Sequence, residues 1–164
     1  MNLKLRQIWI GLAILGALVA ALLLNLLVVT DHERVTKVIR SMAEAAGRAD
    51  VDALLSHVAA DYADDLQDRV GLQASAERLF SRYGPLRVTI QRMTVNVSGR
   101  LASVEVTLSG RGVYRGRSES LGVSVWTIQL RKDDDGVWRV THTTPRWLWE
   151  NEIGSWRELM KRLW

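Results

Sequence analysis

The chain has 164 residues, 48% of them hydrophobic and 24% charged, a composition typical of a globular protein with one domain, which excludes a long disordered segment. Because cysteine is absent, disulfides, thiolate metal sites and cysteine nucleophiles are excluded as well. The formal net charge is +4, but basic and acidic residues alternate along the chain without a basic stripe, so we expect no nucleic acid among its partners.

The first predicted element is an apolar helix over residues 8–29, which contains no charge and one strongly polar residue, Asn25. At a rise of about 1.5 Å per residue, this helix is long enough to cross the roughly 30 Å hydrocarbon core of a bilayer. A cleaved signal peptide is the alternative, but the apolar run is too long for one and lacks a small-residue cleavage site. The sequence therefore predicts a single-pass signal anchor in a bacterial membrane.

The charges on either side of this helix predict its orientation. Lys4 and Arg6 precede it, whereas Asp31 and Glu33 follow it directly. Because basic residues are retained on the cytoplasmic side, we expect a cytoplasmic N-terminus and a periplasmic or otherwise extracytoplasmic domain. Basic residues between positions 34 and 40 oppose this orientation, but long domains are translocated largely regardless of their charge.

Small residues recur at helical spacing within the predicted anchor, at Ala13, Ala17 and Ala21. Such a stripe lets a second membrane helix approach closely, and the amide of Asn25 would seek a hydrogen-bond partner in hydrocarbon. These four residues are candidates for a contact with other membrane-protein subunits. The alternative is that they reflect only the ordinary composition of membrane helices.

Three helices are predicted between residues 31 and 84. Thr30 begins the first with a capping-box pattern, apolar residues then recur at helical spacing, and Gly47 ends it. An aspartate at position 50 or 52 caps a short second helix that runs to about residue 58. The third helix is expected from about Leu72 to Tyr83 and ends before a Gly-Pro pair.

After Pro85 the hydrophobic pattern changes from helical to alternating, which predicts four antiparallel strands. The alternation slips near Gln91, as expected for a β-bulge. Turns are predicted at residues 98–100, as a glycine-rich bend at residues 110–116, and at residues 133–136. The strands on either side of the last turn cover residues 120–131 and 137–144. Helices followed by a bent antiparallel sheet indicate an α+β fold.

Tryptophan is concentrated in the C-terminal segment, residues 146–164, which holds four of the seven tryptophans. Apolar residues repeat there at helical spacing from Ile153 onward, with charged residues between them, so an amphipathic helix is predicted. This helix either covers its own domain or contacts lipid headgroups or a larger membrane protein. The interface candidates are Trp147, Trp149, Trp156, Leu159, Leu163 and Trp164.

Two segments and the strands between them resemble the nuclear transport factor 2-like superfamily, which includes SnoaL-like and ketosteroid-isomerase-like domains. They are AGRADVDALLSHVAADYADD at residues 46–65 and DGVWRVTH at residues 135–142. The resemblance covers about residues 33–145 and implies a cone of three helices on a strongly curved sheet. Members of the superfamily use the pocket inside the cone for catalysis, for ligand binding or not at all. The expected organisation is an N-terminus with its anchor (1–30), this domain (31–145) and the tail (146–164).

The residues expected to line such a pocket are aromatic or ionisable: Tyr62, Tyr83, Tyr114, Trp138 and His142. His142 shares strand parity with Trp138, so it would face the same side, where an imidazole could transfer protons. A histidine on an apolar strand face is more often a core residue, however. No inward-facing acid pairs with a tyrosine as the resemblance to isomerase-like members would require. We therefore assign no catalytic residue.

No metal or other cofactor is expected, because the three histidines are far apart in sequence and residues 133–136 lack the ligand spacing of a calcium loop.

The leading hypothesis is a non-enzymatic, membrane-anchored accessory or assembly subunit that binds other membrane-protein subunits. Self-association into a homo-oligomer remains open. The alternative is a protein that binds a small apolar ligand, or a SnoaL-like enzyme, using the cone pocket. A cone filled by its own side chains would exclude this alternative.

Overall fold

The computed structural model describes residues 30–65, 67–148 and 151–152. The predicted anchor at residues 8–29 lies outside this part, as do Trp149 and the tail from residue 153 onward. Within the described ranges, no helix has the length and apolar character needed to cross a bilayer. The chain divides into two units, Met1–Asp31 and His32–Trp164, and nearly all described residues belong to the second.

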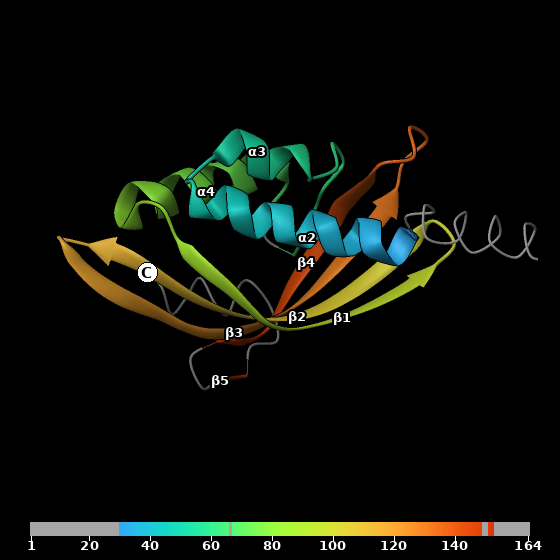
Figure 1. Ribbon diagram of the computed structural model, residues 1–164. Helices are drawn as coiled ribbons and strands as arrows, with labels where there is room; N and C mark the ends of the chain where they lie inside the picture. The colour runs from blue at the N-terminus through green and yellow to red at the C-terminus, as the bar shows by residue number, and fades with distance from the viewer. Residues whose placement is uncertain (1–29, 66, 149–150, 153–164) are drawn as a thin grey trace, which may run out of the picture. The chain divides into compact units, whose positions relative to one another are not determined.

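The described part of the second unit has helices first and strands second, which confirms the predicted α+β class. The helices are α2 (Asp31–Gly47), α3 (Val51–Ser56) and α4 (Arg69–Tyr83). The strands are β1 (Arg87–Ser98), β2 (Leu101–Tyr114), β3 (Arg117–Lys132), β4 (Trp138–Leu148) and β5 (Asn151–Glu152). Consecutive strands pair antiparallel in the order β1-β2-β3-β4-β5. Figure 1 shows that the sheet is strongly curved and that the three helices lie over its concave face.

Local capping signals set the ends of the helices. The side chains of Asp50 and Asp68 each accept a hydrogen bond, at 2.9 Å, from a backbone N–H in the first turn of α3 and α4. Gly84, with a φ of 65°, ends α4 as predicted. The start of α4 lies before the predicted Leu72, because its first turn carries the exposed Val70 and gives no buried apolar signal.

The β-bulge predicted in β1 is present, since the pairing with β2 shifts between Ile90 and Arg92. The bend predicted at residues 110–116 is confirmed only at its end, because the turn is shorter than predicted. Strand β2 continues to Tyr114, and only Arg115 and Gly116, both with positive φ, turn the chain into β3. Of the two glycines of β2, Gly112 allows a close contact with Tyr83, and Gly110 lies where the pairing with β3 shifts.

The C-terminal segment begins as a strand, which differs from the predicted helix over residues 146–164. Strand β4 continues to Leu148, which pairs with Ser124 of β3, and β5 pairs with the end of β4. The strand therefore continues past residue 145, where the domain was predicted to end. Pairing with the long strand β3 extends β4, whereas helical spacing begins only at Ile153, beyond the described residues.

Candidate functional site

The concave face of the sheet, where the resemblance implies a pocket, is covered by the protein's own side chains. Trp138 is 2% exposed and Tyr62 is 1% exposed. Both belong to one hydrophobic cluster that reaches from α2 and α3 to the sheet, and Trp126 packs against it. The largest fully buried side chains beside them are Leu130, Val35, Val104, Val106 and Val140. These positions form a packed core.

One hydroxyl group, that of Tyr62, is part of this core. It donates a hydrogen bond to Oδ2 of Asp64 at 2.5 Å and lies 2.7 Å from Oγ1 of Thr143. Burial raises the pKa of Tyr62, and the hydrogen bond to the Asp64 carboxylate raises it further. The phenol therefore stays protonated at neutral pH and cannot act as a base there. The sequence pattern indicated Tyr62 but neither of its partners.

His142 does not lie on the face of Trp138, so the parity prediction is wrong. Val140 pairs with Leu130 whereas His142 pairs with Gln129, which leaves one extra residue between them in β4. This bulge reverses the alternation, because directly paired residues lie on the same face of a sheet. Thr143, paired with the buried Ile128, takes the inward position instead.

The imidazole of His142 is held by contacts with the chain itself. Its Nδ1 lies 2.8 Å from the carbonyl oxygen of Ala63, and its Nε2 lies 3.1 Å from Oγ1 of Thr144. Because a carbonyl only accepts, Nδ1 carries a proton and donates it to this bond. Both ring nitrogens are thus engaged, Nδ1 by the loop after α3 and Nε2 by a neighbouring residue of β4.

Tyr83 and Tyr114 form a separate cluster where α4 ends and β2 meets β3. Their ring centroids are 5.8 Å apart. The guanidinium of Arg82 lies 5.5 and 5.3 Å from the two ring centroids, and that of Arg115 lies 5.2 Å from the ring of Tyr114. The five predicted pocket residues therefore do not line one pocket: two lie in the core cluster, two form this second cluster, and His142 lies apart from both. Across the described ranges, no group of three histidine or acidic residues is arranged to hold a metal ion.

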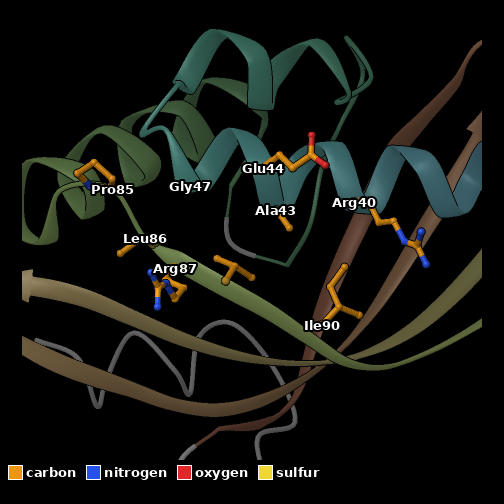
Figure 2. A pocket seen from close by; sticks show the side chains of 9 residues that line it. Arg40, Ala43, Glu44, Gly47, Pro85, Leu86, Arg87 and Ile90 are labelled. Atoms are coloured by element: carbon orange, nitrogen blue, oxygen red, sulfur yellow. The ribbon is translucent and has the colours of Figure 1, made fainter.

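A groove lies between α2 and the edge strand β1 (Figure 2). Figure 2 shows Ala43 pointing from α2 toward β1, with Leu86 and Ile90 along the other wall. The backbone N–H of Leu86 donates a hydrogen bond, 3.0 Å long, to the carbonyl oxygen of Ala46 and so joins the start of β1 to the end of α2. The single acid of the lining, Glu44, is exposed, and no histidine, tyrosine or hydroxyl group accompanies it. The groove can bury apolar groups but lacks a proton-transfer pair.

Replacing Tyr62 by phenylalanine tests whether its hydroxyl is structural. Tyr62→Phe is expected to lower the free energy of unfolding by about 1–3 kcal/mol, because Thr143 and Asp64 lose a buried partner. Tyr83→Phe is the matched control, since the ring contacts of Tyr83 do not involve its hydroxyl. Urea unfolding followed by circular dichroism measures both, and equal stability of the two variants would contradict the structural role.

Tyr62→Phe should also change how the stability of the protein depends on alkaline pH. The pKa of Tyr62 is raised in the folded protein, so the stability from its protonated phenol is complete below the ordinary tyrosine pKa of 10.0. It is lost as the pH rises above that value, because the unfolded chain ionises first. Tyr62→Phe should therefore show a shallower loss of melting temperature between about pH 9 and 11 than the native chain. An unchanged slope would argue against this coupling.

Similarity to proteins of known structure accords with this architecture. A nuclear transport factor 2-like protein with a cystatin-like fold from Novosphingobium aromaticivorans is 22% identical, with 89% of this chain and 95% of that chain covered and a TM-score of 0.60. A nuclear transport factor 2-like superfamily protein from Salmonella enterica is 12% identical over 75% and 94% of the two chains, with a TM-score of 0.63. A protein with a cystatin-like fold from Nostoc punctiforme is 16% identical over 68% and 86%, with a TM-score of 0.58.

At these identities the likeness shows the fold alone. No curated protein matches the chain. The sequence profile of the SnoaL-like domain matches residues 35–144, which is more than half of the chain and spans α2 through most of β4. The chain therefore belongs to the family of SnoaL-like domains.

Proposed function

We propose that this chain is a non-enzymatic accessory or assembly subunit, anchored in a membrane by residues 8–29, whose exported domain binds other membrane-protein subunits. The observation that carries the proposal is the packed interior of the cone. Trp138 and Tyr62, both almost fully buried, occupy the concave face that a ligand would need. Small-molecule sites require an open volume of about 300–1,000 Å³, which a packed core does not offer.

The polar groups of the described residues support the same conclusion. The phenol of Tyr62 has a raised pKa and is buried, so it neither reaches a substrate nor accepts a proton at neutral pH. Both nitrogens of His142 are engaged by the chain, and the bulge in β4 turns this residue away from the face of Trp138. An enzyme needs an acid or base within reach of its substrate, and neither residue meets that requirement.

Three features support binding of protein partners. The groove between α2 and β1 is lined by the half-buried Ile90 and by the buried Leu86, beside an edge strand. The segment from residue 153 onward is rich in tryptophan, a residue type that dominates many interfaces. The small residues of the predicted anchor, with Asn25, suit contact with a second membrane helix.

Co-purification of the full chain from its native membrane tests the proposal. The tagged protein, cross-linked and extracted in a mild detergent, is expected to retain other membrane-protein subunits. A chain ended after Glu152 keeps every described strand and should lose most of these partners, with its melting temperature nearly unchanged. If the native chain is recovered only as a lone monomer, the proposal is wrong. A large drop in melting temperature on truncation would show instead that the tail covers its own domain.

The same co-purification tests the groove. Ala43→Arg would place a long charged side chain between α2 and β1, and it should reduce the recovery of any partner seated there. Ala74→Arg is the matched control, because it makes the same substitution in a shallow depression on α4. Equal recovery with both variants would assign the contact to the tail or the anchor.

A further inference from the structure

The outer, convex side of the sheet carries a second groove of about 430 Å³, built by β1, β2 and β3. Its lining is polar, unlike that of the groove beside α2. It contains two arginines and three hydroxyl groups, from Arg87, Thr89, Ser109, Arg111 and Ser120. Arg87, at the edge of the sheet, also lines the groove beside α2, whereas the other four residues do not. The proposed assembly function makes no use of those four.

Strand register places the two arginines of this groove directly opposite each other. Arg87 of β1 pairs with Arg111 of β2, and Arg111 pairs in turn with Ser120 of β3. Thr89 pairs with Ser109 in the neighbouring row. Paired residues share one face of the sheet, so the row presents two guanidinium groups and a hydroxyl side by side. Like charges directly opposite each other destabilise a sheet unless something neutralises them.

The neutralising group does not come from the described part of the chain. There, ion pairs are formed by Arg100, Arg131 and Arg139, which contact acidic residues of the β3–β4 turn or Asp61. Neither Arg87 nor Arg111 is among them. Two exposed positive charges therefore face the same groove without a carboxylate beside them.

We propose that this groove binds a phosphate-bearing anion. Guanidinium groups present planar, forked donors that match the oxygens of phosphate, and the three hydroxyl groups add further donors. A tetrahedral phosphate has enough oxygens to contact Arg87 and Arg111 at once and carries the charge to offset both.

Phosphate-dependent stabilisation of the full chain, purified in a non-ionic detergent, tests this site. Sodium phosphate is titrated against sodium chloride at constant ionic strength, and the melting temperature should rise saturably with phosphate alone. Arg87→Gln and Arg111→Gln should each weaken the apparent affinity about tenfold, the effect expected for losing a charge-assisted contact. Without phosphate, Arg111→Gln should melt no lower than the native chain, because it removes a like-charge pair.

Arg92→Gln is the matched control. Arg92 is an exposed arginine of β1, the strand that carries Arg87, but it lies outside the groove. This variant should leave the phosphate response unchanged. A short-chain phosphatidic acid, dihexanoyl phosphatidic acid, distinguishes the source of the phosphate. A response to both probes assigns recognition to the phosphate group itself, and a response to the lipid alone, with the same arginine dependence, assigns it to a lipid headgroup. No saturable response to either probe, or an equal loss in Arg92→Gln, would overturn the site whatever the outcome of the co-purification.

Discussion

Replacing Trp138 by alanine is expected to lower the free energy of unfolding by about 3–5 kcal/mol, the cost of removing a large aromatic side chain from a core. Trp138 is 2% exposed and lies in the central hydrophobic cluster. Because whole domains are stable by only about 5–15 kcal/mol, the variant would lose a large share of its stability. Val137→Ala is the matched control, since Val137 is the neighbouring residue and is 44% exposed. Urea unfolding of the native chain and of the two variants measures the three free energies of unfolding.

The same variant also tests whether the cone interior is packed. An apolar cavity left by the indole ring would stay dry and accept an apolar molecule of similar shape. Free indole should therefore raise the melting temperature of Trp138→Ala and leave that of the native chain unchanged. If indole stabilised the native chain equally, the cone would contain an open pocket. The proposal of a non-enzymatic subunit would then lose its main support.

Gly112→Ala is expected to lower the free energy of unfolding by about 1–3 kcal/mol, as overpacking does in a tight core. A Cβ at this position would lie 2.9 Å from the Cβ of Tyr83 and 3.3 Å from its carbonyl oxygen. Neither atom can rotate aside, so the end of α4 would have to move away from β2. The contact of the Tyr83 ring with Tyr114 should weaken with it.

Gly110→Ala is the control for this close approach. It adds the same methyl group to the same strand, where the Cβ would meet Leu121 at 3.4 Å, an ordinary contact distance. Thermal unfolding of the two variants separates the packing effect from the general effect of removing a glycine. Equal melting temperatures would contradict the proposed role of Gly112 in seating α4.

Residues whose structural role depends only on their near neighbours in sequence were predictable. Asp50 as a helix cap, Gly84 as a helix end and the turn at residues 133–136 each depend on local backbone geometry and nearby hydrogen bonds. The two segments that carry the resemblance likewise led to the family of SnoaL-like domains. Glycine was a less certain signal, because the same residue marks a turn at Gly116 and a close packing contact at Gly112.

The candidate site was only partly predictable. Tyr62 was identified as an inward residue, but its bond to Asp64 was not, because three aspartates within five positions have the pattern of a solvated loop. The pairing of Arg87 with Arg111 was likewise not foreseen. The two residues are far apart in sequence and come together only through strand register.

By itself the sequence determined the helices, the order of the strands and most of their turns, because these follow from hydrophobic period and from the backbone preferences of single residues. The tertiary structure decided which side chains face the core. The bulge in β4 is the example: Val140 donates a 2.9 Å hydrogen bond to His57 and accepts another from Ala59 on one edge, while β3 pairs with the other edge. Two partners contact β4 at once, and the extra residue at the bulge places Thr143, not His142, on the inner face. Such a choice depends on contacts between distant segments, for which no local pattern exists.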